Sequence, residues 1–129
     1  ALCEAWDLKT NWVQSTGEVK PSSESLSHAA VYDVQPMANC ALHVHSPEIW
    51  CASRELGIVT TDRKVPYGTP EMANEVHDKV HALSSPGIFS MGGHEDGIFT
   101  FGRTLADAGS LLIDFLVRAR VLKGAGNQQ

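Results

Sequence analysis

The segment Cys40-Ala41-Leu42-His43-Val44-His45 decides both the fold and the candidate site of this chain. It has the length and apolar composition of a buried β-strand, and residues two apart on a strand point to the same face. His43 and His45 are therefore expected to present two imidazoles side by side. A third histidine, His94, lies in the glycine-flanked turn Gly92-Gly93-His94-Glu95. Three imidazole nitrogens with an open fourth position form many catalytic zinc sites, so the pattern indicates metal-assisted chemistry.

Strands and helices alternate on both sides of this segment. Turn residues predict a hairpin within residues 1–20, and Pro21-Ser22-Ser23-Glu24 predicts a serine-capped helix that Pro36 ends. The remaining expected elements are a helix over 47–56, a strand over 58–61, a helix over 70–83, strands over 88–91 and 98–101, and a helix that starts after Thr104. This order favours an α/β fold in which helices cover a sheet. We expect one domain over 1–123 and a disordered tail over 124–129.

Composition excludes several classes of function. The net charge is −5 and the ten Lys and Arg residues are scattered, so a nucleic-acid partner is not expected. The apolar stretches are too short to span a bilayer and the N-terminus has no signal-peptide pattern, so no membrane association is expected either. The three cysteines lack CxxC spacing, which fits free thiols in a reducing compartment. Together these features predict a soluble, cytoplasmic protein.

Three motifs in order resemble the class II aldolase/adducin family over roughly residues 10–120. They are the P-S-S-E-x-x-x-H-x-x-x-Y helix start from Pro21 to Tyr32, the H-x-H strand, and the G-H turn at His94 followed by a G-x-T-L-x-x-A helix. The resemblance implies a three-layer α/β/α fold with a central, largely antiparallel sheet. It also implies that the chain assembles as a homo-oligomer, with a tetramer favoured and sites at subunit boundaries.

The resemblance assigns roles to individual residues. His43, His45 and His94 would hold a divalent metal, Zn²⁺ above all. Glu24 would lie beside it as the catalytic acid/base and could also occupy the open coordination position. Chelation of a substrate carbonyl and its neighbouring hydroxyl would let the metal stabilise an enediolate. Ser22 and Ser23 match positions that hold a substrate phosphate, and the alternative for both is plain helix capping. These roles imply an aldolase-type lyase acting on a small, sugar-like hydroxy-carbonyl compound.

The chain also departs from the sugar-phosphate aldolases of that family. It begins after the G-N-x-S and T-P-S-G-like segments that bind phosphate there, so a phosphorylated sugar is a poorer expectation. The connection from Gly57 to Pro66 is short where those aldolases carry a proton-donating tyrosine, and Tyr67 is not expected to replace it. Epimerisation, dehydration or decarboxylation would use a similar site. The motifs are also compatible with an inactive adducin-like interaction domain or with a degenerate aldolase that only binds metal.

Further polar residues have simpler interpretations. The H-x-H pair itself could be hydrogen-bonded or exposed without binding metal. His28 shares a helix face with Glu24, which allows a supporting role beside the metal, although a packed or exposed histidine without such a role is expected. His77 and His81 lie four apart on a predicted helix and are expected to face solvent. Glu95 and Asp96 receive no role.

Overall fold

The computed structural model describes residues 1–126 and shows two sheets and four helices in that range. The elements in chain order are β1 (Leu2–Asp7), β2 (Trp12–Thr16), α1 (Ser25–Val34), β3 (Cys40–His45), α2 (Pro47–Cys51), β4 (Val59–Thr60), α3 (Pro70–Val80), β5 (Gly87–Ser90), β6 (Gly97–Gly102) and α4 (Leu105–Gly126). The predicted N-terminal hairpin is confirmed, because β1 and β2 pair antiparallel.

The main sheet has the strand order β3-β6-β5-β4. β6 runs antiparallel to both of its neighbours, and the short strand β4 runs parallel to β5. The sheet is therefore mixed and largely antiparallel, as expected. In the β3–β6 register, His43 lies opposite Phe99 and His45 lies opposite Gly97.

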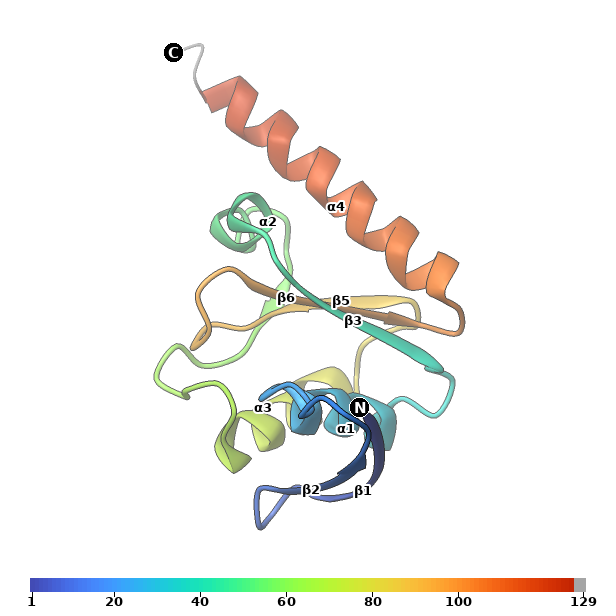
Figure 1. Cartoon of the computed structure of the whole chain (residues 1–129). Coiled ribbons are helices and arrows are strands. Elements are labelled where there is room, and N and C mark those ends of the chain that lie inside the picture. Colours follow the sequence, from blue (N-terminus) through green and yellow to red (C-terminus); the bar gives the residue numbers. More distant parts are fainter. Residues whose placement is uncertain (127–129) are drawn as a thin grey trace.

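Helices cover both faces of this sheet, which confirms the three-layer α/β/α arrangement (Figure 1). α1 and α3 pack together on one face, with the β1–β2 hairpin beyond them, and α4 crosses the other face beside α2. The alternation of side chains along the strands matches the two layers. Phe89, Phe99 and Phe101 join the core under α1 and α3, whereas Ile88 and Ile98 join the core under α4.

The same alternation sends the histidines of β3 towards the α1 face. Ala41 packs against the core under α1 and α3, and Val44 packs against the core under α4. His43 and His45 share the face of Ala41 because they lie two and four residues after it. The candidate ligands therefore lie at the end of an edge strand, where the core under α1 meets the surface.

Local signals explain where the helices start. Ser46 caps α2 by accepting a hydrogen bond from the Ile49 N–H, and Thr69 caps α3 by accepting one from the Met72 N–H. Each cap is followed by a proline at the first helical position, which needs no hydrogen-bond partner for its nitrogen. The predicted starts of both helices are confirmed.

Four predicted helix boundaries are wrong, and the first is the end of α3, which lies at Val80 rather than Leu83 because His81 and Ala82 continue as a turn. α2 ends at Cys51 rather than Leu56, because the Ser53 hydroxyl donates to the Ile49 carbonyl and the chain continues as turns to Gly57, which has a φ of +67°. α1 starts at Ser25, and Glu24 occupies the capping position without a capping side-chain hydrogen bond.

At the other end of the chain, α4 continues through Gly126, so residues 124–126 are helical and not a disordered tail. Residues 127–129 of that predicted tail lie outside the described residues. Within residues 1–126, no helix combines the length and the apolar character needed to cross a bilayer.

Replacement of Ser46 tests whether its side chain stabilises the start of α2. Ser46→Ala should lower the free energy of unfolding by about 1 kcal/mol, because the Ile49 N–H loses its acceptor at the start of the helix. Urea denaturation followed by circular dichroism measures the change. Ser84→Ala, at a position outside the helices, is the matched control, and equal stabilities of the two variants would contradict the capping role.

Candidate metal centre

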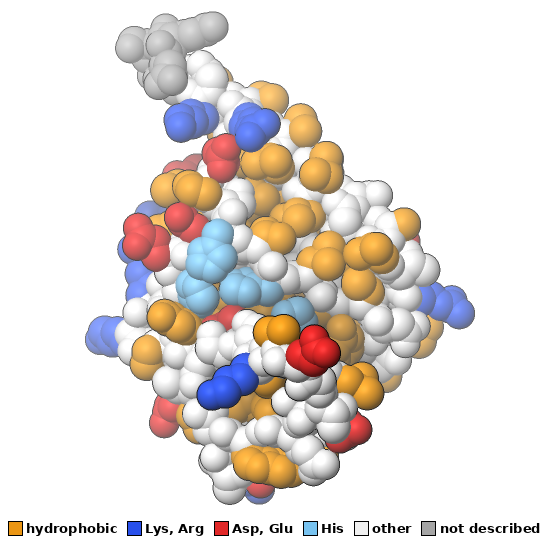
Figure 2. All heavy atoms as spheres, in the orientation of Figure 1, with side chains coloured by type: hydrophobic (Ala, Val, Ile, Leu, Met, Phe, Trp, Pro, Cys, Tyr) orange, Lys and Arg blue, Asp and Glu red, His pale blue; other side chains and the backbone are white. Residues whose placement is uncertain are grey.

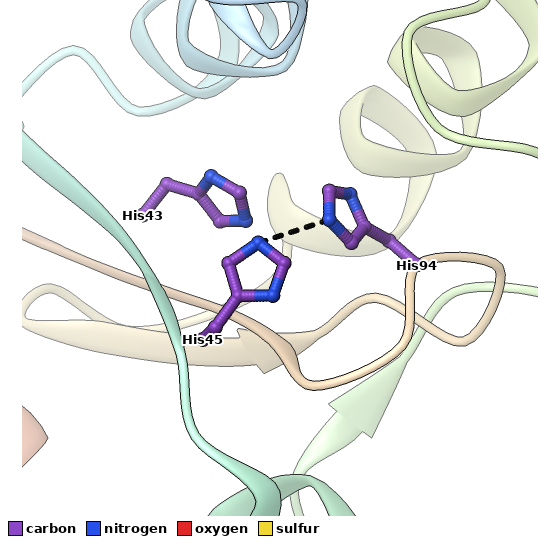
Figure 3. Close-up of side chains that lie close together, drawn as sticks. All are labelled: His43, His45 and His94. Carbon is purple, nitrogen blue, oxygen red and sulfur yellow. Dashed lines mark hydrogen bonds between the residues drawn. The ribbon is translucent and has the colours of Figure 1, made fainter.

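Three histidines converge at one end of the main sheet. His43 and His45 come from β3, and His94 comes from the turn between β5 and β6 (Figure 3). One ring nitrogen from each lies within 4.8 Å of the other two. The closest pair is His94 Nε2 and His45 Nε2, 3.0 Å apart. The structure thus brings together all three predicted ligands, and Figure 2 shows histidine side chains gathered on one face of the molecule.

Glycines let the turn that carries His94 approach its neighbours. An added Cβ at Gly92 would overlap the Thr61 carbonyl oxygen, and one at Gly93 would overlap the Val65 carbonyl oxygen. The Gly92 N–H also donates to Thr61 Oγ1 at 3.0 Å. The turn is therefore pressed against the segment 61–65, where no side chain would fit, and this contact positions His94.

Two features of the ring nitrogens are those expected of a cluster that could hold a metal ion. His43 Nε2 is buried and has no hydrogen-bond partner. Buried polar atoms are normally paired, and those without a partner need an explanation such as a bound ion. The contact between His94 Nε2 and His45 Nε2 likewise joins two nitrogens that can each offer a lone pair. Both features are consistent with a shared cation.

The electrostatic setting of His43 also favours metal binding. Its ring stacks on Phe99 with the centroids 4.7 Å apart. Burial, together with the nearby His94, His45 and His28, lowers the pKa of His43 from 6.5 to about 4. His43 is therefore neutral at pH 7, and a neutral imidazole is the form that binds a metal.

The catalytic candidate Glu24 lies on the far side of His94. Its side chain is only 1% exposed, and Oε1 is 3.5 Å from His94 Nδ1. The other oxygen, Oε2, accepts a hydrogen bond of 2.7 Å from the Ser27 hydroxyl. Because His94 directs Nε2 towards His45, the carboxylate faces the opposite ring nitrogen. Glu24 therefore lies beside the centre. The three candidate ligand atoms that converge at the centre are all histidine nitrogens.

The two candidate phosphate-binding serines are exposed and lie before α1. Ser22 Oγ accepts a hydrogen bond from the Glu24 N–H at 3.2 Å, which is a local contact in the turn before α1 and does not cap the helix. Ser22 also lines a cavity of about 500 Å³ with Lys20 and His28, between α1 and the hairpin. Ser23 lies against Gly68. Their predicted role in binding phosphate stays a prediction.

Tyr67, which was not expected to replace the proton-donating tyrosine of the sugar-phosphate aldolases, is a neighbour of the centre. Its ring centroid is 4.2 Å from that of His94, although the side chain is 52% exposed. The Pro66-Tyr67-Gly68 sequence indicates a turn with an aromatic residue at its tip, and Gly68 has a φ of +69°. That signal could have identified an exposed aromatic, but it could not have shown which side chain the ring contacts.

The remaining candidates do not join the centre. His28 packs edge-on against Phe99 with the centroids 4.8 Å apart, and burial lowers its pKa, so of the two expected alternatives it is the packed one. His77 and His81 are exposed, as predicted, and His77 contacts Asp78. Asp96 contributes its backbone carbonyl to the Ser46 N–H.

Comparisons with known proteins give one finding. A family model described as "Class II Aldolase and Adducin N-terminal domain" matches residues 4–121 of the 129 residues. The match includes all three histidines, Glu24 and Tyr67. Searches of curated proteins and of solved structures gave no match at the significance applied.

Acid should destabilise the metal-free protein through His43. The pKa of His43 is about 4 in the folded protein and near 6.5 in the unfolded chain, so the unfolded chain takes up a proton first as the pH falls. The contribution of His43 to stability is therefore present above pH 6.5 and is lost between about pH 6.5 and 4. Urea denaturation of chelator-treated protein across this range measures the loss. His43→Gln should flatten the pH dependence, and an unchanged profile would contradict the assignment.

Proposed function

Because the chain belongs to the class II aldolase and adducin family, we propose that it is a metal-dependent lyase of the aldolase type. It would cleave or form a carbon–carbon bond next to the carbonyl of a small, hydroxylated, sugar-like substrate. The observation that carries the proposal is the convergence of His43, His45 and His94, whose nitrogens lie within 4.8 Å of one another. Class II aldolases use divalent metals, and this cluster could hold one.

Zinc is the metal that we propose. Three neutral imidazoles suit Zn²⁺, which takes nitrogen ligands and keeps an open position in catalytic sites. A metal held there would supply a Lewis acid that stabilises the negative charge of an enediolate. Aldol cleavage, epimerisation, dehydration and decarboxylation share this requirement, so the site is consistent with each of them.

The residues beside the histidines can carry the protons of the reaction. Glu24 is a buried carboxylate whose Oε1 has no hydrogen-bond partner, and we propose that it exchanges the substrate's proton. Tyr67 offers a phenol next to His94, on the solvent side, and is a second group that could donate a proton. The proposed location is the cytoplasm, which is supported by three cysteines that are all free thiols.

Metal analysis combined with an activity screen tests this function. Wild-type protein should hold about one equivalent of zinc and act on hydroxy-aldehydes or hydroxy-ketones, and His45→Ala should lose both properties because a ligand is missing. Chelation should also lower the melting temperature, since bound metal stabilises only the folded state. His77→Ala removes an exposed histidine on α3 and is the matched control.

Glu24→Gln separates catalysis from folding. Removing an acid/base group should lower kcat by about 10²–10⁴-fold while the protein stays folded. Full activity of Glu24→Gln would contradict its role in proton exchange. A wild-type protein that holds zinc but acts on none of the lyase, epimerase, dehydratase or decarboxylase substrates would instead favour an inactive, adducin-like domain.

We also propose that the chain forms a homo-oligomer, with a tetramer favoured. The proposal is supported by an apolar row on the outer side of α4, formed by Ile113, Val117 and Val121, which are 58%, 55% and 66% exposed. Residues four apart on a helix lie on one side of it. Contact between subunits would remove this row from water.

Light scattering after size-exclusion chromatography tests the assembly. Wild-type protein should elute as a tetramer at micromolar concentration, and Val117→Glu should dissociate it, because a charge would be buried in the contact. Val19→Glu makes the same change at a position that is 70% exposed and outside α4, so it should leave the assembly intact. A monomeric wild-type protein would contradict the proposal.

A further inference from the structure

Behind the metal centre, a chain of polar side chains extends from His94 into α1. Glu24 and Ser27 are 1% and 2% exposed, so both are removed from water. The Ser27 hydroxyl donates to Glu24 Oε2 at 2.7 Å, and Glu24 Oε1 lies 3.5 Å from His94 Nδ1. Glu24 Oε1 and His94 Nδ1 are both buried without any other partner. Glu24 Oε1 is therefore the acceptor that faces His94 Nδ1, and His94 Nδ1 is the nitrogen that faces Glu24 Oε1.

The two nitrogens of His94 face different partners. Nε2 points to His45 and the centre, and Nδ1 points to the carboxylate. A neutral imidazole carries one proton, so a ring that offers the Nε2 lone pair to a metal must carry its proton on Nδ1. A carboxylate beside Nδ1 favours this form, because it can accept a hydrogen bond from Nδ1–H and not from a bare nitrogen.

Ser27 determines which carboxylate oxygen is free for His94. It lies three residues after Glu24, at the start of α1, and its hydroxyl occupies Oε2. Without that hydroxyl, Oε2 would be a second buried oxygen with no partner. The carboxylate would then gain by rotating towards another donor, such as a backbone N–H at the start of the helix. The hydroxyl thus holds the orientation in which Oε1 faces His94.

We propose that Ser27 and Glu24 act together as a positioning pair for His94, which holds its proton on Nδ1 and directs Nε2 to the metal. This inference rests on the proposed metal centre. It describes the orientation of the carboxylate in the metal-free protein, whereas exchange of the substrate's proton would require the Glu24 carboxylate to turn from His94 towards the centre. Ser27 touches neither metal nor substrate and acts only through Glu24.

Zinc affinity measured by competition with a chromogenic chelator tests the pair. Glu24→Gln should weaken zinc binding by about 10–100-fold, the usual effect of losing a carboxylate that supports a metal-bound histidine. Ser27→Ala should weaken it in the same direction by a smaller factor. Ser25→Ala is the matched control: it removes another hydroxyl of the first turn of α1, one that donates to the Ser22 carbonyl instead. Its affinity should equal that of the wild type.

A second measurement separates positioning from general destabilisation. Nitrogen NMR shifts of the histidine rings in metal-free protein should show His94 protonated on Nδ1 in the wild type and in Ser25→Ala. Ser27→Ala should show a mixture of the two ring forms, and Ser27→Thr, which keeps the hydroxyl, should restore the wild-type spectrum. These shifts can be read in any variant that folds, including Glu24→Gln, which keeps the shape of the side chain.

The outcomes distinguish the two proposals. Zinc binding and ring forms that are unchanged in both Ser27→Ala and Glu24→Gln would overturn the positioning pair and leave the metal centre intact. A wild-type protein that binds no zinc would overturn the metal centre, and the pair with it. Weakened binding in both variants, with Ser25→Ala unaffected, would establish the pair.

Discussion

The antiparallel pairing of β3 with β6 is the constraint on which the candidate centre depends. It sets Phe99 opposite His43 and Gly97 opposite His45, and it directs both histidines to the face covered by α1. A shift of one residue along this ladder would send the same side chains to the face covered by α4, away from Glu24. The ladder also ends beside the turn that carries His94. The backbone hydrogen bonds between β3 and β6 therefore bring together two ligands from β3 and a third from the turn that precedes β6.

Around that ladder, the centre concentrates polar atoms that the core does not satisfy. His43 Nε2, His94 Nδ1 and Glu24 Oε1 are all buried and have no hydrogen-bond partner. Two other buried oxygens in the described residues, Ser90 Oγ and Thr100 Oγ1 in the sheet, also lack partners, whereas the Gln35 amide is paired with backbone carbonyls. Leaving such atoms unpaired is costly in a folded protein. Three of the five unpaired atoms lie at or beside the centre, and a cation bound by the histidines would give His43 Nε2 the partner that it lacks.

The sequence predicted the features that depend on local patterns. The apolar H-x-H run predicted a strand with both histidines on one face, and the Ser-Pro and Thr-Pro pairs predicted where α2 and α3 begin. Features that depend on contacts between distant segments could not be predicted. The ring of Tyr67 meets His94 because the 61–68 segment folds back over the site. Similarly, no pattern in Pro21-Ser22-Ser23-Glu24 shows which nitrogen of His94 the carboxylate faces, because that depends on how α1 packs on the sheet.

The close approach of the Gly92-Gly93 turn to residues 61–65 limits how this chain can vary. The turn and the segment are in backbone contact, so neither has room to absorb an added residue at that point. An insertion between Thr61 and Val65 would push the turn aside and move His94 away from the other two ligands. The segment 61–65 contains none of the three histidines, but its length is restricted because it contacts the turn that carries His94. The tip of the β1–β2 hairpin contacts the turn at Gly68 through a side chain instead, since Asn11 Nδ2 donates to the Gly68 carbonyl, and a side-chain contact can adjust to a change in loop length.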